Sequence, residues 1–261
     1  MNLIKKILKG AGFFLLVTLF FIISTIADLI VRDRKKKLIT FSKITSFCAK
    51  ITLIILGIRV NKINWDKYIN SEHNYMIVSN HLSYVDIFVI YSALPAVFIA
   101  NSELKEEFPL GAITAYAGGI FVERRNRSKL LSDMKNISEV LEMAIPTVLF
   151  PEATTSDGEG LLAFKAPFLK SAINTQTNVL PICLNYRKLN GEPITRKNKD
   201  LVFFCEDLSF FAHFFRLLTV NNIDVDVEAL EEIEVNSKMT RKELSQITYD
   251  RISESYEKID A

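Results

Sequence analysis

The chain has 261 residues, of which 49% are hydrophobic and 24% are charged. A chain of this length and composition forms one large domain or two small ones, and it is not disordered, collagen-like or of low complexity. Its three cysteines, Cys48, Cys183 and Cys205, are far apart in the sequence. They make neither a disulfide framework nor a zinc motif, which fits a reducing, cytoplasm-facing location.

The charge of the chain is unevenly distributed, although the net charge is only +2. Residues 1–65 contain 12 of the 32 basic residues but only two of the 30 acidic ones, Asp28 and Asp33. The rest of the chain therefore has 20 basic and 28 acidic residues. A basic, apolar N-terminus ahead of a mildly acidic domain predicts that the partner is an anionic membrane surface and not nucleic acid.

Residues 1–65 carry the signals of a membrane anchor. From Gly10 to Ala27 there is no charged residue, and the run extended to Val31 is long enough to cross a bilayer. Basic residues flank the run on both sides, so the positive-inside rule favours a cytoplasmic C-terminal side only weakly. We predict a hydrophobic membrane-anchoring helical segment; a signal peptide cleaved after Ala27 is the alternative.

A second apolar stretch, residues 38–60, is interrupted by Lys43, Lys50 and Arg59. Such a segment can lie in the membrane interface while its lysines reach towards the lipid headgroups. The sequence is compatible both with an anchor that spans the bilayer and with one that enters from a single side.

In residues 66–261, short β-branched and aromatic runs alternate with helical segments. One helical stripe covers Ser128 to Ala144, and a capping box at Thr240 and Glu243 opens a last helix. The predicted strands are residues 75–79, 96–100, 119–123, 147–150, 179–184 and 201–205. This alternation predicts a single α/β domain, with a largely parallel sheet and flanking helices, after the anchor of residues 1–65.

The strand at residues 75–79 leads into Asn80-His81-Leu82-Ser83-Tyr84-Val85-Asp86. Ser83 and Asp86 look like an N-cap pair that opens a helix, which leaves His81 in the loop before it. A histidine held by a carboxylate through one ring nitrogen can act as a general base with the other. Taken alone, the pair is more simply explained as a capping aspartate beside an ordinary surface histidine. His73 and His213 have no such partner and are predicted to be structural or solvated.

Three further segments contain residues suited to a ligand. Gly118-Gly119-Ile-Phe-Val-Glu-Arg124 combines glycines, which allow close backbone approach, with arginines that suit a phosphate group. Glu152 follows a predicted strand, at the end where α/β sheets place their ligands. Lys165 adds another cation, and Pro181 lies in the apolar run at residues 179–184, which is either a wall of the site or a plain buried strand.

Together, four blocks in this order and spacing resemble the glycerolipid acyltransferase family that contains the 1-acylglycerol-3-phosphate acyltransferases. NHLSYVD is similar to its NHxxxxD block and GGIFVER to its GxxFVDR-type block. FPEATTS is similar to its FPEGTRS block and VLPI to its VxP block. The resemblance covers about residues 74–185 and, because four blocks agree, it is specific.

The resemblance implies an acyl transfer at the membrane. His81 would be the general base that takes a proton from the hydroxyl of a lysophospholipid, most simply 1-acyl-sn-glycerol 3-phosphate, and Asp86 would orient its ring. The acyl donor would be acyl-CoA or acyl-carrier protein, arriving from the cytoplasm. The resemblance implies neither a metal nor another cofactor, and nothing in the sequence indicates an oligomeric state.

The same resemblance assigns the binding residues. Arg124 would hold the phosphate of the acceptor, beside Gly119, with Lys165 as a helper. Glu152 would order the acceptor site, and Pro181 would line the path of the acyl donor.

Two positions depart from the pattern of the family. Glu123 replaces an aspartate, which keeps the charge. Ala153 and Thr155 replace the glycine and the arginine of FPEGTR, so that one expected phosphate contact is lost. Arg125 or Arg127 would compensate, or else the acceptor carries another head group, as in a lyso-ornithine lipid.

Two other classes of function compete with the acyltransferase. A non-catalytic membrane-surface binding protein on the same scaffold predicts the loss of His81 or Asp86, and both are present. A lipid hydrolase requires a nucleophile at a strand-to-helix turn, and the sequence contains no GxSxG motif.

Overall fold

The computed structural model describes residues 3–69, 74–123, 126–204 and 209–259. Within them the chain has one eight-stranded sheet of order β1-β8-β6-β2-β5-β3-β4, with β7 paired to the end of β6. Only the β6–β8 and β6–β7 pairs are antiparallel among the described strands, so the predicted largely parallel sheet is confirmed. The strands are β1 Ile58–Ile63, β2 Tyr75–Ser79, β3 Val97–Asn101, β4 Ile120–Val122, β5 Thr147–Leu149, β6 Asn178–Leu189, β7 Glu192–Pro193 and β8 Ile223–Ala229.

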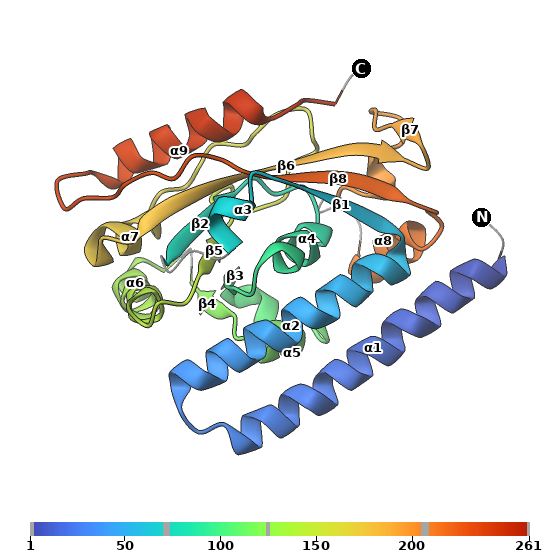
Figure 1. Cartoon of the computed structure of the whole chain (residues 1–261), viewed down its shortest axis with the longest axis horizontal. Coiled ribbons are helices and arrows are strands. Elements are labelled where there is room, and N and C mark those ends of the chain that lie inside the picture. The colour runs from blue at the N-terminus through green and yellow to red at the C-terminus, as the bar shows by residue number, and fades with distance from the viewer. Residues whose placement is uncertain (1–2, 70–73, 124–125, 205–208, 260–261) are drawn as a thin grey trace.

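Helices cover both faces of the sheet, and a hydrophobic core lies on each side (Figure 1). α2, α4 and α8 contribute side chains to one core, and α6, α7 and α9 contribute to the other. This explains why all five residues of β2 are buried: a parallel strand covered on two faces has no solvent side. The helices are α1 Leu3–Ile30, α2 Arg34–Leu56, α3 Asp66–Ile69, α4 Val85–Ala93, α5 Leu110–Tyr116, α6 Arg127–Glu142, α7 Leu169–Thr175, α8 Phe210–Leu217 and α9 Arg241–Ser255, with short 3-10 turns at Ser102–Glu106 and Lys199–Leu201.

The predicted internal helices are confirmed at α6 and α9. Asn126 caps α6, because its side chain accepts a hydrogen bond from the backbone N–H of Ser128. At α9, the hydroxyl of Thr240 accepts from the N–H of Glu243, whose side chain accepts in return from the N–H of Thr240. The capping box therefore forms as the sequence indicates.

The prediction of a strand at residues 201–205 is wrong for its described part. Leu201 ends a 3-10 turn, and the chain then leaves regular structure while Val202 and Phe203 stay buried in the core. An apolar run signals burial but does not by itself distinguish a strand from a buried loop. Three strands were not predicted: β1 and β8, which pair in parallel, and the two-residue β7. β1 lies before residue 65, so the sheet takes a strand from the predicted anchor segment; the division of the chain at that residue stays a prediction.

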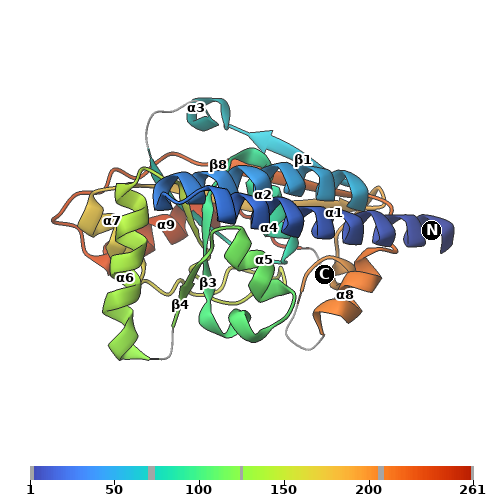
Figure 2. The same cartoon turned by 90° about the horizontal axis from the view of Figure 1, so that it is seen from below.

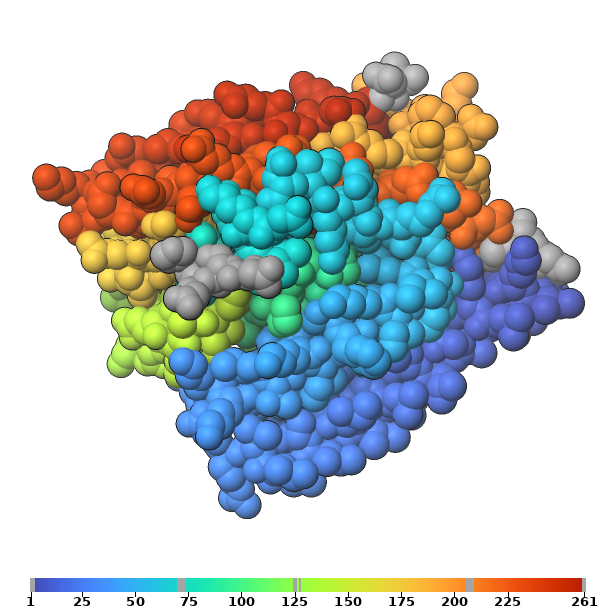
Figure 3. Space-filling model, viewed as in Figure 1, coloured from blue at the N-terminus to red at the C-terminus, as the bar shows by residue number. Residues whose placement is uncertain are grey.

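α1 and α2 are antiparallel and lie side by side along one edge of the molecule (Figures 1 and 2). In the space-filling view they form a continuous outer surface (Figure 3). Both helices are long and apolar enough to cross a membrane, although core helices and signal sequences pass the same test. Much of α1 presents large apolar side chains to the outside, including Leu15, Ile22, Ile26 and Leu29. This is compatible with the predicted anchor.

Lys9, one of the basic residues that flank the apolar run, is hydrogen-bonded within the fold. Its ammonium group donates hydrogen bonds to the carbonyl of Leu56 at 2.6 Å and to that of Val220 at 2.7 Å. Leu56 is the last residue of α2, where carbonyl groups lack helical partners. The lysine therefore joins α1 to the end of α2 and to the segment before β8.

Candidate active site

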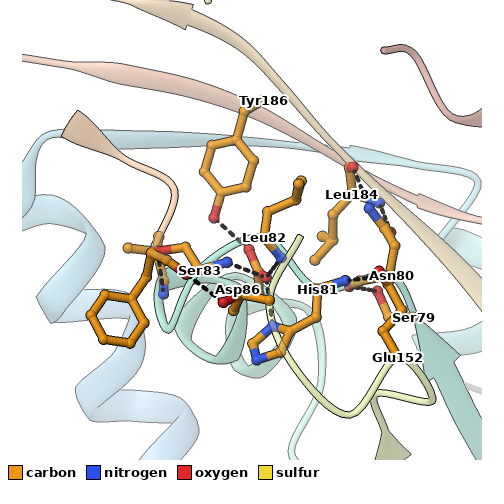
Figure 4. A network of polar contacts seen from close by, with 12 residues as sticks. Ser79, Asn80, His81, Leu82, Ser83, Asp86, Glu152, Leu184 and Tyr186 are labelled. Atoms are coloured by element: carbon orange, nitrogen blue, oxygen red, sulfur yellow. Dashed lines mark hydrogen bonds and ion pairs between the residues drawn. The ribbon is translucent and has the colours of Figure 1, made fainter. Parts of the chain in front are cut away.

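The candidate site lies where β2 ends, at the carboxyl edge of the parallel strands. The side chain of Asn80 there extends the ladder between β2 and β6. Its amide donates to the carbonyl of Leu184 at 3.0 Å, and its oxygen accepts from the N–H of Leu184 at 2.8 Å. Both bonds are buried, so the start of the loop is fixed to the central strand β6 (Figure 4).

His81 and Asp86 meet across the turn that leads into α4. Nδ1 of His81 lies 2.8 Å from Oδ2 of Asp86, and Asp86 is fully buried whereas the His81 side chain is 17% exposed (Figure 4). The carboxylate fixes the tautomer in which Nδ1 carries the proton. Nε2 has no hydrogen-bond partner among the described residues, so its lone pair is available for a proton from a ligand.

The predicted N-cap pair forms in part, since the Ser83 hydroxyl accepts from the N–H of Val85 at 3.4 Å and Asp86 accepts from the N–H of Ser83. Tyr84 is the N-cap residue of α4 and makes no side-chain cap. Oδ2 of Asp86 accepts the backbone N–H groups of Leu82 at 2.6 Å and Ser83 at 2.9 Å. The aspartate thus orders the turn and holds the histidine with one oxygen.

The other oxygen of Asp86 has a partner that the sequence did not indicate. The hydroxyl of Tyr186, on β6, donates to Oδ1 of Asp86 at 2.6 Å (Figure 4). Side chains alternate between the two faces of β6, and the even-numbered residues from Leu180 to Tyr186 face the α4 side of the sheet. This alternation is the one sequence signal that places Tyr186 on the same side as Asp86.

The ring of His81 is also held from the side of β5. It stacks on Phe150 with 3.9 Å between ring centroids and 12° between ring planes. The N–H of Ser156 donates to the carbonyl of His81 at 2.8 Å. The histidine is therefore confined by a ring on one side and by hydrogen bonds at its backbone and side chain.

Glu152 is buried and joins two loops. Its Oε1 accepts the backbone N–H of His81 at 2.9 Å, and its Oε2 accepts that of Leu162 at 2.9 Å. Burial raises the pKa of Glu152 to about 7, against the lowering effect of these two hydrogen bonds, and the nearby charge of Asp86 raises it further. The carboxyl group thus links the histidine loop to the segment that follows Phe150.

The departures from the family pattern have local structural counterparts. Ala153 has φ of +67°, a left-handed conformation that glycine adopts more easily. The hydroxyl of Thr155 donates to the carbonyl of Phe204. The residue at the position of the family arginine is therefore engaged inside the protein.

The remaining predicted binding residues are placed as follows. Arg124 lies outside the described residues. Gly119 lies at the turn before β4, where an added Cβ would come within 2.5 Å of the Thr114 side chain, so the turn requires a glycine. Lys165 is exposed, and its N–H donates to the carbonyl of Pro151. Pro181 is a buried residue of β6 paired with Val78, and the alternation along the strand directs it away from the His81 face.

His73 and His213 are the other two histidines of the chain. His73 lies outside the described residues. His213 is fully buried on α8, where its Nε2 donates to the carbonyl of Phe203 at 3.0 Å and its Nδ1 accepts from the hydroxyl of Tyr84 at 2.9 Å. It is held by the fold, and Tyr84, in the turn that follows His81, is the partner that sequence spacing did not reveal.

Known proteins are similar to this chain in sequence and in fold. A family model described as Acyltransferase matches residues 60–185. The chain is 27% identical over 210 residues to the lyso-ornithine lipid O-acyltransferase of Rhizobium meliloti (strain 1021). The aligned region covers 78% of this chain and 71% of that protein. It is 36% identical over 121 residues to the 1-acyl-sn-glycerol-3-phosphate acyltransferase of Neisseria gonorrhoeae, covering 46% of this chain and 48% of that one. The crystal structure of the 1-acyl-sn-glycerophosphate (LPA) acyltransferase PlsC from Thermotoga maritima has the same fold, with a TM-score of 0.68, 21% identity and coverage of 98% and 96%.

The family match, the acyltransferase relatives and the shared fold support a glycerolipid acyltransferase. The enzyme is an acyltransferase like the 1-acylglycerol-3-phosphate acyltransferases, and its relatives support acyl transfer to a lysolipid. The resemblance predicted from the four blocks and the predicted enzyme class are both confirmed.

Proposed function

We propose that this enzyme transfers an acyl group from a thioester to the free hydroxyl of 1-acyl-sn-glycerol 3-phosphate, which gives phosphatidate. The observation that carries the proposal is the bond of 2.8 Å between Nδ1 of His81 and the buried carboxylate of Asp86. It leaves Nε2 as the proton acceptor on the open side of the ring.

In the proposed reaction, Nε2 of His81 takes the proton of the lysolipid hydroxyl while its oxygen attacks the thioester carbonyl carbon. The carbon–sulfur bond then breaks, and the imidazolium returns the proton to the departing thiolate. Asp86 keeps its negative charge and stabilises the imidazolium in between. Atoms and protons balance without a covalent acyl-enzyme, a metal or a redox cofactor.

Two acceptors that differ in their head group are candidates. The run of arginines from Arg124 supports a phosphate group, because guanidinium groups bind phosphate through paired hydrogen bonds. A lyso-ornithine lipid is the second candidate. It is favoured by Thr155, which stands where the family has an arginine and donates to the carbonyl of Phe204, and by the Rhizobium relative.

We also propose that α1 and α2 attach the enzyme to the membrane and that the active domain faces the cytoplasm. The outward apolar side chains of α1 support attachment. On α2, Lys43, Phe47, Lys50 and Ile54 are all exposed, and mixed lysine and apolar side chains fit the membrane interface better than the hydrocarbon core. We therefore favour attachment from one side of the bilayer. Acyl-CoA or acyl-carrier protein would then reach the site from the cytoplasm.

The experiment that tests the function uses the purified full-length enzyme with a panel of lysolipids and with acyl-CoA and acyl-carrier protein as separate donors. Mass spectrometry identifies the acylated products. His81→Ala should lower the rate by about 10²–10⁴-fold while circular dichroism stays unchanged. Near-normal turnover by a folded His81→Ala enzyme would refute the mechanism.

The acceptor is tested with Arg124→Ala. If the substrate is 1-acyl-sn-glycerol 3-phosphate, the loss of a charge-assisted contact should lower kcat/KM by roughly 10- to 150-fold. Arg124→Lys should recover only part of it. A silent Arg124→Ala, together with faster acylation of a phosphate-free lysolipid, would replace this acceptor by the lyso-ornithine lipid.

Orientation in the membrane is tested by placing a single cysteine at exposed Glu192, in a chain whose native cysteines are replaced. A membrane-impermeant thiol reagent should label it in inside-out vesicles and not in right-side-out ones. The opposite pattern would place the domain on the other side.

A further inference from the structure

The carboxylate of Asp86 is fully buried, and its two oxygens have unequal partners. Oδ2 accepts from Nδ1 of His81 and from two backbone N–H groups of the turn. Within the described part of the chain, Oδ1 accepts one hydrogen bond, from the hydroxyl of Tyr186 at 2.6 Å. A buried charged oxygen without a donor costs free energy, and the Tyr186 hydroxyl is the donor that Oδ1 has here.

Tyr186 is itself held firmly in place. It is a residue of β6, only 7% exposed, and its ring packs edge-on against Phe203 with 5.5 Å between centroids. Two residues earlier, Leu184 is fixed to the catalytic loop by the two hydrogen bonds with Asn80. The strand that presents the hydroxyl and the loop that presents His81 are therefore fastened to each other directly beside the site (Figure 4).

We propose that Tyr186 is a positioning residue of the acyl transfer, which fixes the orientation of the Asp86 carboxylate and shares its negative charge. The proposal rests on the proposed role of His81 as the general base. In this role Tyr186 acts on the histidine through Asp86, to which its hydroxyl donates.

The chemistry of the phenol supports this role. Burial and the adjacent charge of Asp86 raise the pKa of Tyr186 far above its usual value, so the hydroxyl stays protonated and can only donate to Oδ1. A hydroxyl that donates to a carboxylate draws negative charge towards itself. Without it, more charge would remain at Oδ2, and the imidazolium form of His81 would become more stable.

The test is Tyr186→Phe, which removes the hydroxyl and keeps the ring. The rate of acyl transfer to 1-acyl-sn-glycerol 3-phosphate, or to the best acceptor of the panel, is measured against pH. We expect kcat to fall about 10-fold with KM for the acceptor nearly unchanged. The acid limb of the pH–rate profile should move to higher pH by roughly 0.3–1 unit. A shift of this size corresponds to the net free energy of one hydrogen bond.

Tyr68→Phe is the matched control. Tyr68 is also 7% exposed and donates a hydrogen bond to a backbone carbonyl, that of Leu230 at 3.0 Å, but it lies at α3 and away from the His–Asp pair. It should lower the thermal stability to a similar extent and leave the pH profile of the rate unchanged.

The results distinguish a failure of the role of Tyr186 from a failure of the role of His81. If His81→Ala is inactive and the acid limb of Tyr186→Phe coincides with that of the unaltered enzyme, the role of Tyr186 is refuted and the general base stands. A reduced kcat without a shift has the same meaning, because lost packing alone would produce it. If His81→Ala retains activity, the proposed function itself fails.

Discussion

The hydroxyl of Tyr84 donates a hydrogen bond of 2.9 Å to Nδ1 of His213, and this bond connects the turn that follows His81 to α8. The opposite nitrogen of His213 donates to the carbonyl of Phe203. On the same helix, Phe214 contacts Phe13 of α1 with 4.5 Å between ring centroids. α8 therefore lies between the N-terminal helix and the loop that carries His81.

His213 should be required for the stability of this connection. Burial lowers its pKa, in agreement with a neutral ring that donates at one nitrogen and accepts at the other. His213→Leu leaves the hydroxyl of Tyr84 and the carbonyl of Phe203 without their partner, and we expect a loss of about 1–3 kcal/mol in the free energy of unfolding. Thermal unfolding in detergent measures it.

A double-mutant cycle separates this bond from general packing. Tyr84→Phe removes the hydroxyl, so Tyr84→Phe with His213→Leu should cost less than the sum of the two single substitutions. Strictly additive losses would show that the hydrogen bond does not couple the two residues.

Ala153→Gly should stabilise the protein. The residue has φ of +67°, which costs a Cβ-bearing residue about 1–2 kcal/mol and glycine almost nothing. Part of the gain is lost because glycine makes the unfolded chain more flexible, which leaves roughly 0.5–1 kcal/mol. Ala163→Gly, in the same segment but not at positive φ, should instead lower the melting temperature. Equal effects of the two substitutions would contradict the conformational explanation.

The sequence predicts those parts of the site that are local in the chain. His81 and Asp86 are five residues apart and meet through one turn, so a motif is sufficient to find them. Tyr186 is 100 residues away from Asp86, and its role depends on the pairing of β6 with β2. No pattern within residues 179–189 distinguishes that hydroxyl from one that faces a plain core.

In the fold, too, the sequence predicts the strands with a clear local pattern and misses those without one. β2 and β6 were predicted because continuous apolar runs mark strands that are buried on both faces. β8 has alternating buried and half-buried residues, and its partner β1 comes from the end of the anchor segment, so that neither resembles a buried parallel strand. The error at residues 201–205 has the opposite cause, since a loop that covers a core is as apolar as a strand.

Glu152 should make the stability depend on pH. Its pKa of about 7 in the folded protein exceeds its ordinary value of 4.5. Between these values the folded chain keeps a proton that the unfolded chain has lost, so the free energy of unfolding decreases as the pH rises from 4.5 through 7. Glu152→Gln lacks this titration, and the melting temperature of the unaltered protein should therefore decline relative to the variant over this range. A constant difference from pH 5 to 8 would contradict the raised pKa, and exposed Glu192→Gln serves as the control.

Lys9→Met tests whether the lysine stabilises the fold or binds lipid headgroups. Its ammonium group donates to the carbonyls of Leu56 and Val220, and charged hydrogen bonds of this kind contribute about 1.5–3 kcal/mol. Because Met keeps the length and the apolar stem, we expect the melting temperature in detergent to fall by roughly 3–10 °C while the protein still sediments with membranes. Lys5→Met, at an exposed position of the same helix, should leave the melting temperature unchanged. If Lys9→Met and Lys5→Met behave alike, and both weaken binding to anionic vesicles, Lys9 acts as a headgroup-binding lysine and α1 is held to α2 by its apolar contacts alone.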